Sequence, residues 1–121
     1  MDPEIFDIPL SFSLLTVELS PVGQDLLLTV RGGDKPHIGC VVLTEPRPSL
    51  KGDGSISCTS SVLSVPGHKD ELLCRSLAEK AAVRYNRRVV CAGGFHVDNA
   101  SGKQLAEILK KIHEFLFPAQ A

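Results

Sequence analysis

Five stretches of the chain have the pattern of hydrophobic and polar residues that is typical of strands. In residues 11–19 and 25–31, aliphatic and polar side chains alternate, as expected for strands with one buried face. Residues 38–44 and 87–92 are short, nearly continuous apolar runs, which favours central strands. Residues 55–65 are rich in Ser and Thr, and Ile56, Cys58 and Ser60 would share one face. We therefore predict five strands.

Two longer stretches have apolar residues at helical spacing. Residues 68–86 are predicted to form the first helix, whose apolar stripe is Cys74, Leu77, Ala78, Ala81 and Tyr85. Residues 101–117 are predicted to form the second helix, with the stripe Leu105, Ile108, Leu109, Ile112 and Leu116. Ser101 and Gln104 have the spacing of a capping box, and Pro118 ends the segment.

The order of these elements predicts an α+β fold: strand, strand, strand, strand, helix, strand, helix. We expect a mainly antiparallel five-stranded sheet with two helices on one face. Residues 1–9 are expected to be an irregular lead-in, and residues 45–54, with Pro46, Pro48 and Gly52, a mobile connection. The sheet has more apolar alternation than two helices cover, so a second subunit is expected on its other face.

Three segments between the predicted elements each contain glycine, a histidine and an acid. They are residues 32–37, 66–70 and 93–99. If the first four strands form a meander, and the first helix makes a right-handed crossover to the fifth strand, all three segments lie at one end of the sheet. Both helices would begin at that end as well.

Such an end is suited to binding an anion. Helix N-termini present unpaired N–H groups, and glycines let a backbone approach a ligand closely. Lys35 and Lys69 add positive charge, and His37, His68 and His96 add hydrogen-bond donors. The segments therefore predict an anion or nucleotide-phosphate pocket, although each glycine, histidine or acid alone could serve only turn geometry or helix capping.

Composition narrows the class of protein. A length of 121 residues fits one domain, and a net charge of −1 provides no general attraction to nucleic acid or anionic lipid. Aromatic residues are few, which disfavours a base-stacking surface. The four cysteines form no CxxC pair and are expected to be reduced. No secretory signal or membrane-spanning apolar run is present, so we expect a cytoplasmic protein.

Four functions remain open on these residues. A metal-dependent small enzyme could use His37, His68 and His96 with Asp34 or Asp98, although no two of these share a helix at ligand spacing. A hydrolase would need a nucleophile, and no GxSxG elbow is present. A nucleotide- or flavin-binding module would lack both the GxGxxG and the Walker motif. A protein-assembly chaperone without a cofactor would fit the Ser/Thr-rich strand and the one-sided sheet.

The three segments also resemble a known family. GGDKPHIG at residues 32–39, PGHKDEL at 66–72 and GFHVDNA at 94–100 look like the signature segments of the LpdD-like family, and the order and spacing match over roughly residues 11–117. Members are understood as chaperones for reduced prenylated flavin mononucleotide (FMN), associated with UbiD-type decarboxylases such as gallate decarboxylase. The resemblance implies a non-enzymatic homodimer with a fold similar to that of proteasome assembly chaperones.

The resemblance also implies a cofactor site. Gly67, His68 and Lys69 would hold the phosphate, and Asp34, Lys35, His37, His96 and Asp98 would line the pocket and orient the isoalloxazine edge. The full set of expected cofactor-binding residues is Gly32, Gly33, Asp34, Lys35, His37, Gly67, His68, Lys69, His96, Asp98 and Asn99. The expected partner is a UbiD-type decarboxylase that receives the cofactor.

Overall fold

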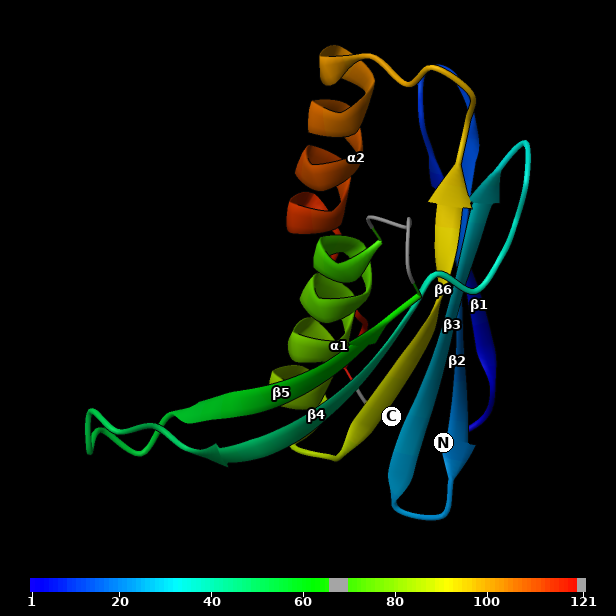
Figure 1. Cartoon of the computed structure of the whole chain (residues 1–121). Coiled ribbons are helices and arrows are strands. Elements are labelled where there is room, and N and C mark those ends of the chain that lie inside the picture. The colour runs from blue at the N-terminus through cyan, green and yellow to red at the C-terminus, as the bar shows by residue number, and fades with distance from the viewer. Residues whose placement is uncertain (66–69, 120–121) are drawn as a thin grey trace.

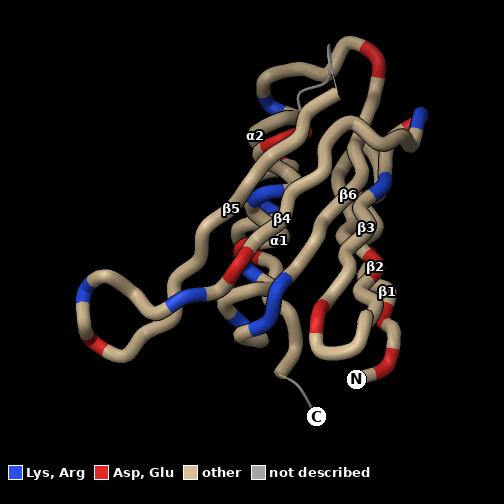
Figure 2. Tube along the Cα trace, turned by 60° about the horizontal axis from the view of Figure 1, so that its bottom comes forward, with Lys and Arg blue, Asp and Glu red and all other residues tan. Residues whose placement is uncertain are grey.

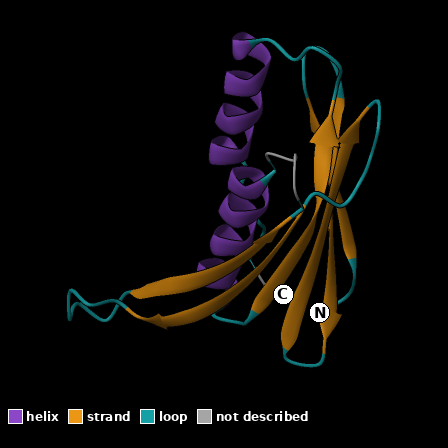
Figure 3. Cartoon of the chain, in the orientation of Figure 1, coloured by secondary structure: helices purple, strands orange, loops and turns teal. Residues whose placement is uncertain are grey.

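A computed structural model describes residues 1–65 and 70–119 of the chain. Within these residues, six strands form one sheet, and two helices cover the same face of it (Figures 1 and 3). The α+β class and the placement of the helices are as predicted, whereas the sheet has one strand more. The elements are β1 (Glu4–Pro9), β2 (Leu14–Val22), β3 (Asp25–Gly33), β4 (Cys40–Pro48), β5 (Ile56–Ser64), α1 (Glu71–Tyr85), β6 (Val89–His96) and α2 (Gly102–Glu114).

The additional strand is β1, so the prediction of an irregular lead-in for residues 1–9 is wrong. It pairs antiparallel with β2 and places Phe6 and Ile8 on the inner face opposite Val17 and Leu15. The Phe6 ring lies 5.4 Å from the ring centroid of Phe115 near the other end of the chain. A six-residue strand that depends on so distant a contact carries little signal in its own sequence.

The sheet order is β1-β2-β3-β6-β4-β5, so the predicted meander of four consecutive strands is also wrong. The last strand, β6, inserts between β3 and β4, parallel to the first and antiparallel to the second. Its apolar start suits this position, because a strand with neighbours on both sides and a helix above it is buried. The sheet is therefore mixed, with one parallel pair among antiparallel ones.

The direction of the strands nevertheless brings the three glycine-rich segments to one end. Strand β3 is parallel to β6, and β5 is antiparallel to β4, which is itself antiparallel to β6. All three strands that precede the segments therefore run the same way. Both helices start at this end and run back along the sheet (Figure 1).

Two predicted loops are in part strand. Strand β3 continues through Gly32 and Gly33, which pair in parallel register with Phe95 and His96 at the end of β6. Strand β6 likewise includes Gly93 and Gly94, which pair with Val30 and Arg31 of β3. The predicted mobile connection of residues 45–54 is likewise wrong at its start, since β4 runs to Pro48 and pairs with β5. Pairing of β4 with β6 ends at Thr44, so the prolines of β4 lie where it has a partner on one side only.

The helices are shorter than predicted. The structure places the start of α1 at Glu71, after the N-cap residue Asp70, and its end before Asn86, which has the expected left-handed conformation with φ of 52°. Residues 68 and 69, included in the predicted helix, lie outside the described residues. Helix α2 has the predicted capping box of Ser101 and Gln104. It ends at Glu114 because the following residues extend to place Phe115 and Phe117 against Phe6.

The core lies between the helices and the inner sheet face. Cys40, Cys74 and Cys91 are fully buried there, Cys58 is half-buried, and all four cysteines are free thiols. Acidic and basic segments are interspersed along the chain (Figure 2). No helix in the described part of the chain is long and apolar enough to cross a membrane.

Candidate functional site

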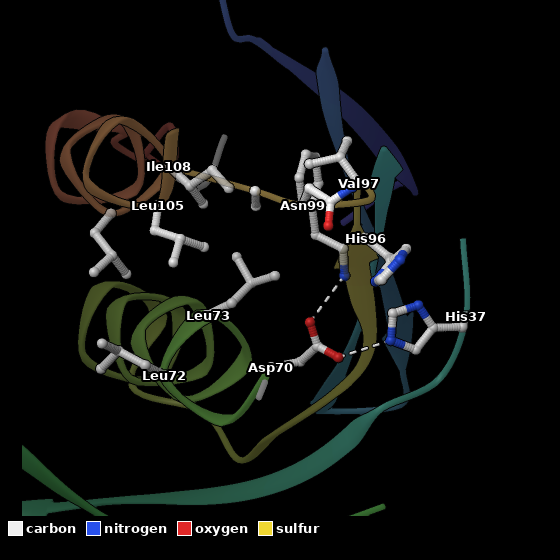
Figure 4. Close-up of a pocket in the computed structure, with 12 residues that line it drawn as sticks. His37, Asp70, Leu72, Leu73, His96, Val97, Asn99, Leu105 and Ile108 are labelled. Atoms are coloured by element: carbon white, nitrogen blue, oxygen red, sulfur yellow. Dashed lines mark hydrogen bonds and ion pairs between the residues drawn. The ribbon is translucent and has the colours of Figure 1, made fainter. Parts of the chain in front are cut away.

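A cavity of about 480 Å³ opens at the end of the sheet where both helices begin (Figure 4). Its apolar lining comes mainly from the first turn of α1 and from α2, with Leu72, Leu73, Leu105, Ile108 and Leu109. Phe95, Val97 and Ala100 continue this lining from β6 and the segment that follows it. Several of these leucines remain open to solvent: Leu105 is 52% exposed and Leu72 42%. The cavity thus has an apolar interior, and the helix side of its rim is apolar as well.

The opposite wall is polar. His37, Asp70, His96 and Asn99 line it, and the first three come from the three glycine-rich segments that the sequence singled out. Figure 4 shows the His37 and Asp70 side chains pointing toward each other beside β6, while Leu73 and Leu105 lie across from them. The cavity therefore combines one hydrogen-bonding wall with apolar surface, which is typical of small-molecule sites.

Asp70 occupies the edge of β6 that β4 leaves uncovered. Pairing of β6 with β4 begins at Gly93, so beyond that residue β6 has no strand on this side. The Phe95 N–H donates to Asp70 Oδ1 at 3.0 Å instead. As the N-cap residue of α1, Asp70 makes no side-chain cap hydrogen bond to its own helix. Its carboxylate joins the start of α1 to the end of β6.

The second oxygen of Asp70 meets His37. Nε2 of His37 lies 2.8 Å from Asp70 Oδ2, and Nδ1 lies 3.0 Å from the Lys35 carbonyl oxygen. The hydrogen bond to the Lys35 carbonyl is the largest effect that raises the pKa of His37; burial opposes it, and Asp70 raises it further. Asp70 is nearly buried, with 9% of its side chain exposed, whereas 21% of the His37 side chain is exposed.

Gly94 makes room for this pair. A Cβ atom at Gly94 would lie 2.6 Å from His37 Nε2 and 2.7 Å from Asp70 Oδ2, both far inside van der Waals contact. The two side chains therefore pass directly over the backbone of β6 at a position where only glycine fits without displacement.

A second histidine and acid lie at the rim. Nε2 of His96 is 2.9 Å from Asp98 Oδ1, and Lys35 Nζ is 3.2 Å from the same oxygen. The hydrogen bond from His96 and, next, that from Lys35 lower the pKa of Asp98. The rings of His37 and His96 lie edge to face with centroids 6.3 Å apart. The rim cluster is exposed and joins the first segment to the third.

The predicted metal alternative finds no support among the residues described. No group of three or more His, Cys, Asp or Glu side chains within residues 1–65 and 70–119 is placed to hold a metal ion. His68, one of the three histidines of that alternative, lies outside this part of the chain.

Comparison with known proteins decides the family. The model of the prenylated flavin chaperone LpdD-like domain matches residues 13–117 of the chain. The chain belongs to the LpdD-like family. No curated protein matches it at a significant level. Among solved structures, it is similar to a chain from the crystal structure of a novel chaperone complex for yeast 20S proteasome assembly. The two chains are 14% identical, with a TM-score of 0.47, and the match covers 93% of this chain and 99% of the other.

The residues that the LpdD-like resemblance pointed to fall into four groups, the last of which is Gly32 and Gly33, described in the next paragraph. His37, His96 and Asn99 line the cavity. Lys35 and Asp98 pair at the rim, and the Asp34 N–H donates to the His96 carbonyl oxygen at 2.8 Å. The third group is Gly67, His68 and Lys69, which lie outside the described residues, so their expected role stays a prediction.

Gly32 and Gly33 have a structural role in this LpdD-like chain, because they allow a close approach between neighbouring strands. Gly33 has a φ of 79°, and a Cβ there would lie 2.1 Å from the His96 carbonyl oxygen. A Cβ at Gly32 would lie 2.5 Å from the Leu14 carbonyl oxygen of β2 and 2.7 Å from the Phe95 ring of β6. Both glycines let β3 lie close against the end of β6, so they shape the polar wall, and neither lines the cavity.

Sequence reasoning missed two parts of the site. Asp70 falls within the predicted first helix, residues 68–86, and spacing in the sequence does not show its link to His37 and Phe95. The leucines of α2 were assigned to a core-facing stripe, but Leu105 and Leu109 line the cavity and are 52% and 40% exposed. The sequence does carry one sign of this, because the apolar stripe of α2 is wide and includes Leu105 and Leu109 beside Ile108 and Ile112.

Proposed function

We propose that this chain binds reduced prenylated FMN in the cavity at the start of the two helices and delivers it to a UbiD-type decarboxylase. The observation that carries the proposal is a cavity of about 480 Å³ with leucines on one side and His37, Asp70 and His96 on the other, in a chain of the LpdD-like family. A flavin has a large flat ring system with polar groups along one edge, which matches such a pair of walls.

The cavity suggests how the cofactor would lie. The ring system would pack against Leu73, Leu105 and Phe95, and its polar edge would face His37 and His96. The phosphate would lie at the start of α1, where the Asp70 side chain leaves the first N–H groups uncapped. Gly67, His68 and Lys69 precede this turn in the sequence, and their part in holding the phosphate is a prediction.

A carrier must release its cargo, so the affinity would be moderate. A dissociation constant on the order of 1 µM corresponds to about 8 kcal/mol, enough to hold the cofactor and still yield it to a tighter site. In this proposal the chain performs no reaction of its own and works in the cytoplasm beside the decarboxylase.

The direct test is an anaerobic titration of the purified protein with reduced prenylated FMN and, separately, with ordinary reduced FMN. Micromolar binding of the prenylated form is expected. Leu105→Asp should weaken it at least tenfold, because a carboxylate would enter the apolar wall. Leu116→Asp is the matched control, since Leu116 is 79% exposed and lies outside the cavity lining. Failure of the unmodified protein to bind either flavin would refute the proposal and favour a protein-assembly role.

Delivery needs its own experiment. Protein loaded with reduced prenylated FMN should activate an apo UbiD-type decarboxylase faster than the same amount of free cofactor, measured as carbon dioxide release. The Leu105→Asp variant should give no acceleration. Equal activation by free and carried cofactor would contradict the delivery role and leave only binding.

The proposal includes a homodimer formed through the uncovered sheet face. Strand register places two apolar rows there: Leu27, Val90 and Leu43 in one, and Ala92, Val41 and Leu63 in the next. Leu43 is 40% exposed and Leu63 74%. Such contiguous apolar surface is suited to a subunit contact.

Sedimentation tests the homodimer. The unmodified chain should sediment as a dimer, Leu43→Lys as a monomer, and Leu50→Lys as a dimer. Leu50 is the control because it is 91% exposed in the turn between β4 and β5, outside the two rows. A monomeric unmodified chain would contradict this part of the proposal.

A further inference from the structure

Strand β5 has a partner strand on one side only in the described part of the chain. It pairs with β4 and ends the sheet order (Figure 1). Its nine consecutive pairs with β4 keep one register, so no bulge twists this edge. A row of backbone N–H and C=O groups therefore runs along the edge without a strand to accept it, an arrangement to which another strand can add.

The two edges of the sheet differ in how well they are protected. The edge strand β1 has six residues, among them Glu4, Asp7 and Pro9, and charges and proline are common means of keeping other strands off an edge. The nine residues of β5 include no charged residue, no proline and no glycine. The chain thus protects one edge of its sheet and leaves the other open to a further strand.

The ladder to β4 shows which groups of β5 face outward. In the same register, beyond its two ends, the Val65 N–H donates to the Gly39 carbonyl oxygen and the Ser49 N–H to the Ser55 carbonyl oxygen, each at 2.9 Å. In an antiparallel ladder, hydrogen-bonded pairs alternate with pairs that are not bonded to each other. Counted from either end, the residues whose N–H and C=O groups point away from β4 are Ile56, Cys58, Ser60, Val62 and Ser64.

We propose that β5 is the docking edge for the acceptor decarboxylase, which adds an extended segment to it as a seventh strand. The inference rests on the proposed function, because that function supplies the partner. The edge ends beside the cavity: Ser64 pairs with Cys40, which closely follows His37 of the cavity wall in the sequence. A partner strand along β5 therefore brings the decarboxylase to the end of the sheet from which the cofactor leaves.

The side chains beside the edge define the chemistry of the added segment. On the helix side, the Ser60 hydroxyl donates to Glu79 Oε2 at 2.7 Å, so this side favours hydroxyl or basic side chains in the partner. On the other side, Leu63 is 74% exposed, which favours an aliphatic neighbour. The segment should therefore alternate polar and aliphatic residues and carry no acid on the helix side.

The size of the contact favours a transient partner over a second copy of this chain. Nine residues of strand extend about 30 Å, and a sheet with its side chains is about 10 Å thick, so the added strand covers roughly 300 Å² of each partner. A stable interface buries about 1,200–2,000 Å² in total. An edge of this size suits a contact that forms for delivery and then separates.

Amide hydrogen exchange, read residue by residue by NMR after the complex is dissociated, tests the inference. In the chain alone, exchange should be fast at the outward amides of Cys58, Ser60 and Val62, and slow at the residues between them, whose N–H groups bond to β4. With an apo UbiD-type decarboxylase, exchange at the outward amides should slow at least tenfold. Decarboxylase binding without this change would overturn the inference. Slow exchange without the decarboxylase, increasing with protein concentration, would place a second copy on the edge and also overturn it.

Proline variants test the same contact through affinity. Proline at an outward position removes one outward N–H and no hydrogen bond to β4. Cys58→Pro should weaken decarboxylase binding at least tenfold, whereas the matched control Cys58→Ala, which keeps the N–H, should bind within twofold of the unmodified chain. Ser64→Pro and Ser64→Ala repeat the comparison if circular dichroism shows that Cys58→Pro does not fold. All four variants should bind reduced prenylated FMN normally, because neither residue lines the cavity.

The outcomes separate this inference from the proposed function. Equal decarboxylase affinity of the folded proline and alanine variants would overturn the docking edge while flavin binding stands. Failure of the unmodified chain to bind either flavin would overturn the proposed function, and with it the choice of the decarboxylase as the partner of β5.

Discussion

Replacement of Gly94 by alanine is the sharpest structural test of the polar wall. The new Cβ would lie 2.6 Å from His37 Nε2 and 2.7 Å from Asp70 Oδ2, and ordinary contact begins near 3.4 Å. Both side chains would have to withdraw by roughly 0.7–0.8 Å. Because Gly94 does not have a positive φ, this contact and not backbone strain would cause the effect.

Such a displacement cannot be absorbed without loss of hydrogen bonds. The His37–Asp70 contact of 2.8 Å and the Phe95–Asp70 contact of 3.0 Å share the carboxylate that must move. A hydrogen bond to a charged group contributes about 1.5–3 kcal/mol, and overpacking costs about 1–3 kcal/mol. The two costs do not add in full, because side chains that withdraw lose hydrogen bonds but relieve the overpacking. We therefore expect Gly94→Ala to lower the free energy of unfolding by about 2–3 kcal/mol.

Urea denaturation at pH 6 and fixed protein concentration, followed by far-UV circular dichroism, measures this loss. With a slope of about 2 kcal/mol per molar urea, the midpoint should fall by about 1 M. Gly102→Ala is the matched control, because a Cβ there meets nothing within 4 Å at the start of α2. It should be neutral or stabilising by up to about 1 kcal/mol. A Gly94→Ala protein within about 0.5 kcal/mol of the unmodified chain would refute the reasoning.

Three further predictions concern other groups. The pKa of His37 is raised above its ordinary value of 6.5, first by the Lys35 carbonyl, so its folded form binds a proton more tightly than its unfolded form. Its stabilisation is therefore fully present below pH 6.5 and lost as the pH rises through the folded pKa. The stability difference between the unmodified chain and His37→Gln, from urea titrations between pH 5.5 and 8.5, should shrink with rising pH; a constant difference would contradict this. Ser101→Ala removes half of the capping box of α2 and should lower the free energy of unfolding by about 1 kcal/mol in the same assay, whereas no loss would mean that the cap is redundant. Under native conditions a thiol reagent should label Cys58 alone, because the other three thiols are buried, and slowly, since burial raises the pKa of Cys58; labelling of two or more thiols would show that the core opens.

Local patterns predicted the elements whose stabilising contacts are close in sequence. The capping box at Ser101 and the left-handed stop at Asn86 are both present, because each depends on residues within one helical turn. Strand β1 was missed because its Phe6 packs against Phe115, a contact that no local window contains. The same limit explains why α2 ends at Glu114 and not at Phe117 as predicted. The last aromatic residues leave the helix and pack against β1, a contact that is distant in sequence.

The sheet order shows a different limit. Alternation and apolar runs identify strands, but they do not say which strands are neighbours. The chain returns β6 to the centre of the sheet, where its apolar residues are buried between β3 and β4, and a meander would have left it at an edge. The direction of each strand is unaffected by this insertion, so the three glycine-rich segments still meet at one end even though the predicted order was wrong.

Asp70 explains why those segments act as one site. It belongs to the second segment, accepts from His37 of the first, and accepts from the Phe95 backbone of the third. In sequence it resembles any acid at the start of a helix, and its position beside the open edge of β6 gives it a different task. Because one carboxylate holds both partners, displacing it loosens both sides of the polar wall together. Gly94 is the residue that permits this arrangement. A substitution at Gly94 or at Asp70 should therefore change the stability of the polar wall and the protonation of His37 together.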